Sequence, residues 1–380
     1  MKKKNILIAL PTDRIGGAEI YLKIIVEEFA SQDFRFYIVV QREKDAGIFE
    51  NIKAEEKNIF YNSAVKDYWF FSFILNIWRN RKIQFDYAFT SCSHLNSLVG
   101  LFRILHILKI KYFVARENTL MFNRKADFNM FKEKMYYLLG YSAIDLLICQ
   151  TEYMKQQLVE NLPWLEKKVN VQVIANPINL DNSFSKAKEK VDYNFEFSCI
   201  VAAGRLVDVK GFDILIHAFS KLKQKYKSLK LVILGEGKLR GVLAQQINDL
   251  HLEDDIILYG SAKNVYPFFK NARMCVVSSR IEGFPNVLLQ EMSQNEKIVS
   301  TLCADGIDKL EGVFTCKTND EADLVRAMKE CLVADTSKNR EIFDKELQSR
   351  SIDKFVKRIM DYEKAMKEQD IEEALQSKLC

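Results

Sequence analysis

The sequence predicts an α/β protein of two domains, each built around a mainly parallel β-sheet. In both halves of the chain, short apolar runs of strand length alternate with segments of helical spacing, as βαβ units require. A polar segment without periodicity, residues 179–195, separates the two series and is interpreted as the connection between the domains. With 380 residues, the chain is long enough to bury two hydrophobic cores.

Six apolar runs predict the strands of the N-terminal domain. The first run ends at a loop that contains Gly16 and Gly17, and residues 18–30 follow it with helical spacing. Ligands of open parallel sheets bind at the carboxyl ends of the strands, so this glycine turn is a candidate binding position. The six predicted strands are residues 5–10, 35–40, 85–90, 111–115, 146–150 and 171–175.

Two segments between these strands are rich in large apolar side chains, and the second also carries cations. Residues 68–78 are strongly aromatic, and residues 95–110 interleave Leu, Ile and Phe with Arg103, His106 and Lys109. Both segments are too short or too charged to span a bilayer. Either they form core-facing helices of the sheet, or they lie in a membrane interface with their cations toward the lipid headgroups.

The net charge of +5 is unevenly distributed along the chain. Residues 1–178 carry 25 Lys and Arg with 19 Asp and Glu, whereas residues 179–380 carry 31 with 32. The excess is concentrated in residues 66–134, which hold 12 basic and 5 acidic residues. We therefore expect an anionic surface or ligand to meet the N-terminal half.

The composition bears on compartment and on metal binding. The eight cysteines are scattered without a C-x-x-C pair, which predicts reduced thiols in a cytosolic protein and neither a zinc site nor a disulfide framework. The basic start is followed only by a strand-length apolar run, so no signal peptide is expected. No uncharged apolar stretch is long enough to span a membrane. We expect a cytoplasmic protein with no nucleic-acid partner.

A second series of strands and helices begins after the connecting segment. Glycines follow four of its strands, at Gly204, Gly235, Gly260 and Gly283, and together they suggest a nucleotide cleft at the carboxyl edge of the sheet. The tail, residues 351–380, is highly charged with apolar residues at helical spacing and predicts an amphipathic helix. The six predicted strands are residues 198–203, 230–234, 255–259, 274–278, 297–301 and 313–316.

Two cations and one carboxylate fall at these strand ends. Arg205 and Lys210 flank a turn and can approach a diphosphate from two sides. Residues 274–292 predict a strand, a Gly/Pro loop and the start of a helix, whose free N–H groups favour an anion. Glu282 in that loop would repel an anion, so we expect it to bind neutral groups such as sugar hydroxyls. The alternative for this stretch is an ordinary βα loop.

In these motifs the chain resembles the GT-B glycosyltransferases, specifically the large retaining family 4. The resemblance covers nearly the whole chain, and the A-N-P-I-N segment at 175–179 is similar to the interdomain connection of the family. The motifs that carry it, in the order and spacing of the family, are G-G-A-E at 16–19, G-R-L-x-x-x-K-G-F-D at 204–213, L-G-E-G at 234–237 and E-G-F-P-N-V-L-L at 282–289.

The resemblance implies two Rossmann-like domains with parallel sheets that face each other across a cleft. It assigns acceptor binding to residues 1–178 and nucleotide-sugar binding to residues 179–350. It also implies that a C-terminal helix, residues 351–380, crosses back onto the N-terminal domain. The family needs neither metal nor cofactor, and the chain agrees in having no D-x-D sequence.

The resemblance also implies roles for individual residues. Arg205, Lys210 and the helix N-terminus near Asn286 would stabilise the leaving diphosphate in place of a metal. Glu282 would hold hydroxyls of the donor sugar, and the departing phosphate would help to deprotonate the acceptor. Gly16 and Gly17 would approach the phosphate from the other domain, and the loop 261–264 would hold the base through its backbone. The further donor-binding residues are Gly204, Gly235, Lys263, Asn264, Gly283, Phe284, Pro285, Val287 and Gln290.

The sequence departs from the family pattern at two places. Where the family has a second Glu, eight residues after the first, this chain has Gln290, and the adjacent Glu291 lies about 100° around the helix. We expect altered nucleotide binding rather than loss of function. Many relatives have a His after the strand at 111–115, where this chain has Arg116 and Glu117, which could contact phosphate and acceptor. His94 either lines the acceptor site or is structural.

The leading hypothesis is a retaining, metal-independent glycosyltransferase that moves a hexose from a UDP- or GDP-sugar to a saccharide acceptor. By analogy with the family, the acceptor is expected on a polyprenyl-diphosphate lipid, in the synthesis of a bacterial surface polysaccharide such as O-antigen, capsule or lipopolysaccharide. The protein would then be peripheral on the anionic, cytoplasmic face of the inner membrane. The alternatives are a non-catalytic GT-B scaffold subunit and a glycosyltransferase with a soluble acceptor.

Overall fold

The chain divides into two compact units, residues Met1–Pro177 with Ile352–Cys380, and residues Ile178–Ser351. Each unit holds one parallel β-sheet, so the predicted α/β class with two parallel sheets is confirmed. The computed structural model describes residues 3–13, 16–30, 34–42, 47–50, 52, 56–61, 81–118, 120, 122, 128–191, 193 and 198–379. The predicted aromatic segment 68–78 lies outside these residues.

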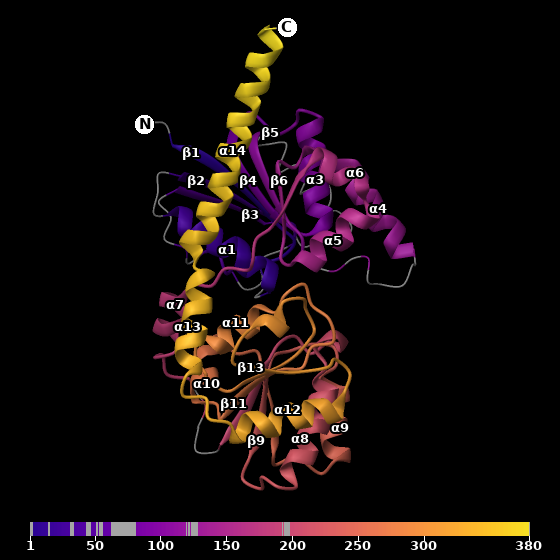
Figure 1. Ribbon diagram of the computed structural model, residues 1–380, viewed down its shortest axis with the longest axis vertical. Coiled ribbons are helices and arrows are strands. Elements are labelled where there is room, and N and C mark those ends of the chain that lie inside the picture. The colour runs from indigo at the N-terminus through magenta and orange to yellow at the C-terminus, as the bar shows by residue number, and fades with distance from the viewer. Residues whose placement is uncertain are drawn as a thin grey trace. The chain divides into compact units, whose positions relative to one another are not determined.

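The first unit contains a seven-stranded sheet in the order β3-β2-β1-β4-β5-β6-β7 (Figure 1). Side chains alternate between its two faces, so that Leu7 and Ala9 join one core while Ile6, Ile8 and Leu10 join the other. The strands are β1 (Lys4–Leu10), β2 (Phe34–Val40), β3 (Glu56–Tyr61), β4 (Gln84–Ser91), β5 (Lys109–Arg116), β6 (Leu146–Cys149) and β7 (Asn170–Val173).

Helices cover both faces of this sheet. One face packs against the apolar residues of α3 to α6, and the other packs against α1 and α14. On α14, Phe355 and Ile359 are buried against this second core, and Tyr362 and Met366 are partly buried there. The helices are α1 (Gly17–Ala30), α3 (Ser93–Ile104), α4 (Phe128–Gly140), α5 (Glu152–Asn161), α6 (Pro163–Lys168) and α14 (Ile352–Leu379).

The structure corrects the interpretation of residues 95–110 as one amphipathic helix. Helix α3 ends at Ile104, and strand β5 begins at Lys109, with a tight turn between them in which His106 adopts φ 56°. Most of the apolar residues of α3 face the core, as the first alternative predicted, but Ile104 and Leu105 at its end are exposed. Strand β3 was not predicted, because its sequence E-K-N-I-F-Y is half polar and its side chains are only partly buried.

The second unit contains a six-stranded sheet in the order β10-β9-β8-β11-β12-β13. Strand order reverses between the neighbours β8 and β11, and the carboxyl ends of strands at such a switch point form the ligand crevice of open α/β sheets. The strands are β8 (Cys199–Ala203), β9 (Lys230–Leu234), β10 (Ile256–Gly260), β11 (Met274–Val277), β12 (Ile298–Thr301) and β13 (Val313–Cys316).

Seven helices of the described chain belong to this second unit. One face of its sheet packs against α8, α9 and α12, and the other packs against α10, α11 and α13. Contrary to the prediction, part of the segment 179–195 is helical: Asn179 caps α7 by accepting a hydrogen bond from the N–H of Asn182. The helices are α7 (Leu180–Lys186), α8 (Phe212–Lys223), α9 (Arg240–Asp249), α10 (Tyr266–Asn271), α11 (Asn286–Met292), α12 (Glu321–Val333) and α13 (Asn339–Ser349).

Seven cysteines occur in the described part of the chain, all as free thiols, and six of them are buried. Burial raises the pKa of the Cys316 and Cys331 thiols to about 12. Burial also raises the pKa of Cys303 to about 12. Within the described residues, no helix combines the length and the apolar character needed to cross a membrane.

Candidate active site

The carboxyl ends of β8, β9 and β10 meet through backbone contacts that leave no room for side chains. The N–H of Gly204 donates to the carbonyl of Leu234, and the N–H of Gly235 donates to the carbonyl of Gly260. A Cβ atom at Gly235 would lie 1.9 Å from the carbonyl oxygen of Gly204. A Cβ at Gly237 would lie 2.4 Å from the carbonyl oxygen of Leu206. Three of the four predicted glycine-marked strand ends therefore form one closely packed floor.

Two loops rise from this edge at the switch point and bring Lys210 and Glu282 together. Lys210 follows β8, Glu282 follows β11, and Lys210 Nζ lies 2.5 Å from Glu282 Oε1. The stem of Lys210 crosses Gly204, where an added Cβ would lie 3.3 Å from its Cδ and Cε atoms. Two residues predicted from separate motifs thus form one ion pair.

The carboxylate of Glu282 is held by the protein on one side only. Its Oε1 accepts hydrogen bonds from Lys210 Nζ and from Ser279 Oγ at 2.7 Å, whereas Oε2 has no partner among the described residues. The backbone is fixed as well, because the N–H of Glu282 donates to the carbonyl of Cys303. Glu282 therefore offers one free acceptor oxygen, as a holder of sugar hydroxyls requires.

Two further predicted cations border the same strand ends. Arg205 and Lys263 are exposed, and within the described chain neither side chain has a hydrogen bond or ion pair. Asn264 has a different use, since its amide donates to the carbonyl of Lys186 and to Glu189. The side chain of Asn264 thus anchors its loop to the start of the unit.

The loop from Gly283 to Asn286 is mostly buried. Gly283, Phe284 and Pro285 are buried, and the guanidinium of Arg350 lies over the Phe284 ring at 4.9 Å. Helix α11 begins at Asn286, with Val287 after it, and spans only seven residues. A helix of under two turns has a weak dipole. The support for an anion in this site therefore comes from the cations rather than from the N-terminus of the helix.

Gln290 and Glu291 occupy very different environments on α11. Gln290 is partly buried, and its amide donates to the hydroxyl of Tyr266 at 3.4 Å. Glu291 is completely buried, and neither of its carboxylate oxygens has a hydrogen-bond partner among the residues that the structure describes. Burial raises the pKa of Glu291 well above its usual value, and the charge of Lys210 offsets only part of this effect. Glu291 is therefore a buried carboxyl group with a raised pKa, beside the candidate site.

In the first unit, the predicted glycine turn begins helix α1. Gly17 is the first residue of α1, and a Cβ at Gly16 would lie 2.5 Å from Glu19 Oε2. The other oxygen of Glu19 accepts from Thr12 Oγ1. His94, near the start of α3, has its Nε2 2.9 Å from Gln41 Oε1 at the end of β2. These residues lie at the carboxyl edge of the first sheet, where predicted.

Arg116 and Glu117, the predicted acceptor-side residues, are each only 2% exposed. Arg116 donates to Asn118 and Asn176, and burial lowers its pKa to about 10. Glu117 accepts from the hydroxyls of Tyr141 and Tyr137. Arg116 thus links the end of β5 to the segment after β7, and Glu117 links it to α4 and the turn after α4.

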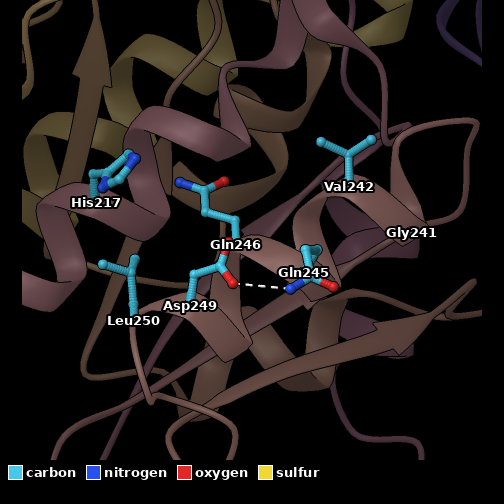
Figure 2. Close-up of a pocket in the computed structure, with 7 residues that line it drawn as sticks. All are labelled: His217, Gly241, Val242, Gln245, Gln246, Asp249 and Leu250. Carbon is cyan, nitrogen blue, oxygen red and sulfur yellow. Dashed lines mark hydrogen bonds between the residues drawn. The ribbon is translucent and has the colours of Figure 1, made fainter.

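A groove of about 630 Å³ lies apart from these residues, between α8 and α9 (Figure 2). Its polar lining is largely paired within the protein: Gln245 donates to Asp249, and Gln246 donates to the carbonyl of Asp213. None of the strand-end residues lines this groove, whose walls are His217, Gly241, Val242, Gln245, Gln246, Asp249 and Leu250. The chemistry of the second unit is concentrated at the switch point instead.

Comparison with protein families agrees with the motif geometry. A model described as "Glycosyltransferase Family 4" matches residues 15–182, and a model described as "Glycosyl transferases group 1" matches residues 198–334. Together they span most of both units. The chain belongs to glycosyltransferase family 4.

Curated relatives of this family 4 glycosyltransferase include several bacterial enzymes. A Campylobacter jejuni N-acetylgalactosamine-N,N'-diacetylbacillosaminyl-diphospho-undecaprenol 4-alpha-N-acetylgalactosaminyltransferase is 33% identical over 188 residues, 50% of each chain. A Rhizobium meliloti lipopolysaccharide core biosynthesis glycosyltransferase, LpsE, is 29% identical over 55% of this chain and 63% of its own. An uncharacterized Methanocaldococcus jannaschii glycosyltransferase is 26% identical over 66% of each chain. The match thus spans between half and two thirds of these relatives' length.

Solved structures match the family 4 glycosyltransferase over nearly its whole length. Anabaena HepE in complex with UDP and glucose has a TM-score of 0.76 at 16% identity, over 95% of this chain and all of that one. Sucrose-phosphate synthase from Thermosynechococcus elongatus has a TM-score of 0.76 at 14% identity, over 96% and 99%. At these identities the matches establish the fold, and the predicted GT-B class is confirmed.

Proposed function

We propose that the protein transfers a hexose from a nucleotide sugar to a saccharide acceptor, with retention of the anomeric configuration and without a metal ion. The second unit binds the donor. Lys210 and Arg205 neutralise the charge that develops on the leaving diphosphate, and Glu282 accepts hydrogen bonds from hydroxyls of the transferred sugar. Gln290 replaces the usual second Glu at the ribose and donates or accepts without charge.

The observation that carries this proposal is the position of the Lys210–Glu282 pair at the switch point, with one carboxylate oxygen free. The Lys210 cation and the Glu282 carboxylate, which can accept hydrogen bonds from neutral hydroxyls, lie 2.5 Å apart. This arrangement matches a ligand whose phosphate and sugar are covalently adjacent. The close packing of the glycine strand ends beside them fixes the base of the loop that carries Lys210. The binding of UDP and glucose by the structural neighbour HepE supports the same donor class.

A donor screen followed by transfer assays tests the proposal. A matching UDP- or GDP-sugar raises the melting temperature of the wild-type protein, because it binds only the folded state. Lys210→Ala lowers kcat by about 10²–10³, the usual loss when a preorganised electrostatic donor is removed. Lys221→Ala, an exposed lysine of α8, is the matched control and keeps wild-type rates. Unchanged kcat in Lys210→Ala, or no transfer and no donor hydrolysis by the wild type, contradicts the proposal.

We further propose that the acceptor is carried on a polyprenyl diphosphate and that the first unit meets the anionic cytoplasmic face of the inner membrane, in surface-polysaccharide synthesis. The name of the Campylobacter relative includes a diphospho-undecaprenol acceptor, which supports a lipid carrier. On the first unit, large apolar side chains are exposed on the neighbouring helices α3 and α4 and in the turn after α3. These side chains, the α3/α4 patch, are Ile104, Leu105, Met135, Leu138 and Leu139.

The charge around the α3/α4 patch fits an anionic lipid surface. No Asp or Glu occurs between Asp86 and Glu117, a stretch that includes the exposed Lys109 after α3. Lys134, on α4, is also exposed. Apolar side chains bordered by cations are typical of surfaces that enter the headgroup region of a membrane.

A further inference from the structure

Lys210 and Glu282 are 72 positions apart in sequence, and each belongs to a loop of its own. The loop 204–211 follows β8, and the loop 278–285 follows β11. The spacing between the cation and the carboxylate therefore depends on how firmly these two loops are held to each other.

Arg280 joins the two loops without belonging to the ion pair. Its Nη1 donates to the carbonyl of Asp208 at 2.5 Å and to Asp213 Oδ1 at 2.9 Å, and its Nη2 donates to Asp213 Oδ2 at 2.6 Å. Its backbone N–H donates to the carbonyl of Val209 at 2.8 Å. Burial alone raises the pKa of Asp213, but the hydrogen bonds and charge of Arg280 outweigh it and leave that pKa below its usual value.

The backbones of the two loops are also in direct contact. Gly211 adopts φ +62°, and a Cβ there would lie 2.2 Å from the carbonyl oxygen of Ser278. Ser278 Oγ in turn donates to the carbonyl of Lys210 at 2.9 Å. Because the fit is this close, a small rotation of either loop changes the position of Lys210 relative to Glu282.

A bound donor competes for the two groups that form the ion pair. Its diphosphate attracts Lys210 and its hydroxyls attract Glu282, so the ion pair cannot be what keeps the loops together in the occupied site. The bidentate Arg280–Asp213 pair joins two protein side chains, and it fixes both the distance and the orientation of the two loops. We infer, on the basis of the proposed function, that Arg280 is a positioning residue that holds Lys210 and Glu282 at the spacing a nucleotide sugar needs.

The kinetic test compares Arg280→Gln with the wild type. If only molecules with correctly placed loops bind the donor, the apparent donor affinity falls with their fraction, so the donor KM rises about tenfold while kcat stays within about threefold. Arg280→Lys keeps the charge but cannot bridge three acceptors, so its donor KM rises less than that of Arg280→Gln. Asp213→Asn raises the donor KM as much as Arg280→Gln does. The donor KM of the double variant is no higher than that of either single variant. Lys210→Ala shows the opposite pattern, a loss in kcat.

The matched control is Arg326→Gln. Arg326 in the same unit also bonds two carboxylates and a carbonyl, through Asp323, Glu330 and the carbonyl of Thr315, but it does not touch either loop. Loss of a guanidinium network elsewhere lowers the melting temperature without raising the donor KM. If the donor KM rises as much in Arg326→Gln as in Arg280→Gln, the rise is explained by a general loss of stability. That result would overturn the inference.

Hydrogen exchange of the free protein provides a readout that needs no activity. Amides that bridge or brace the loops, those of Lys210, Gly211, Arg280 and Glu282, exchange several-fold faster in Arg280→Gln and Asp213→Asn than in the wild type or Arg326→Gln. Unchanged exchange in both variants, or a donor KM within about twofold of wild type, rejects the inference. If the wild type transfers no sugar, the proposed function fails, and the exchange measurement still decides the role of Arg280.

Discussion

Among the described residues, Glu291 combines complete burial with a carboxyl group whose two oxygens both lack a hydrogen-bond partner. A carboxyl group with no hydrogen-bond partner and no exposed surface costs free energy even when it is neutral. Replacing it by an apolar side chain of similar length, Glu291→Met, is expected to raise the free energy of unfolding by about 1–3 kcal/mol at pH 7. Chemical denaturation followed by fluorescence measures the change, and a destabilised Glu291→Met protein would contradict it.

The pH dependence of Glu291 has a defined sign. Its pKa is raised in the folded state, so the unfolded chain ionises first as the pH increases above the ordinary Glu pKa of about 4.3. From there the wild type loses about 1.4 kcal/mol of stability per pH unit relative to Glu291→Gln, until the folded pKa is reached. Glu253→Gln, at an exposed position of the same unit, is the matched control for the substitution. Parallel profiles for Glu291→Gln and the wild type between pH 4 and 7 would show that Glu291 is ionised or solvated.

At the scale of elements, helix α14 comes from the C-terminal end of the sequence but belongs to the first unit. Phe355 is 3% exposed and meets the ring of Tyr21 on α1 edge-on, with centroids 5.7 Å apart. Phe355→Ala is expected to destabilise the first unit by about 3–5 kcal/mol, as for other buried Phe truncations. Lys364→Ala, on the exposed side of α14, should change stability by less than about 0.5 kcal/mol. Thermal unfolding distinguishes them, and equal melting temperatures would show that α14 is not anchored.

Which elements were predictable depended on how strongly each one is buried. Both sheets were read from apolar runs because parallel strands covered on both faces consist of little else. Strand β3, with its partly buried polar residues, lacked that signal. Helix α7 is seven residues long, too short for a periodic pattern. Its Asn179 cap is the local signal that could have indicated it. The turn at His106 could not be anticipated from residues 95–110, whose composition suits a continuous helix.

The site was predictable where a motif is local and not where side chains from distant segments meet. Lys210 and Glu282 were both expected, and their approach follows from the strand order at the switch point. The bridging role of Arg280 depends on packing across more than sixty residues and has no local signature. The same holds for the burial of Arg116 and Glu117, whose hydrogen-bond partners Asn176 and Tyr141 come from other parts of the chain.

At the scale of the whole molecule, the α3/α4 patch leads to a binding prediction. We expect the protein to sediment with anionic vesicles at low salt and to be released at high salt, because the electrostatic part of the attraction is screened. Leu138→Ser with Leu139→Ser should weaken binding about tenfold, since each loses apolar area that would enter the membrane. Co-sedimentation with phosphatidylglycerol vesicles measures both effects.

The control for the vesicle experiment is an exposed apolar residue of the other unit. Val242 is 63% exposed, and Val242→Ser should leave vesicle binding unchanged. Absence of salt-sensitive binding by the wild type would favour a soluble acceptor. Equal binding by the double leucine variant would exclude the α3/α4 patch as the contact, and a change in its mass in solution would identify the patch as an interface between copies.

The buried thiols of this protein have a practical consequence for spectroscopy. With six of the seven described cysteines buried and the pKa of Cys303, Cys316 and Cys331 near 12, these side chains hold almost no thiolate at neutral pH. Maleimide dyes should therefore leave them unmodified while the fold is intact. A new cysteine on each unit would provide attachment points for a fluorophore pair, with Cys92 and Cys380 replaced beforehand. Energy transfer between the dyes could then follow the two units while donor and acceptor substrates are added.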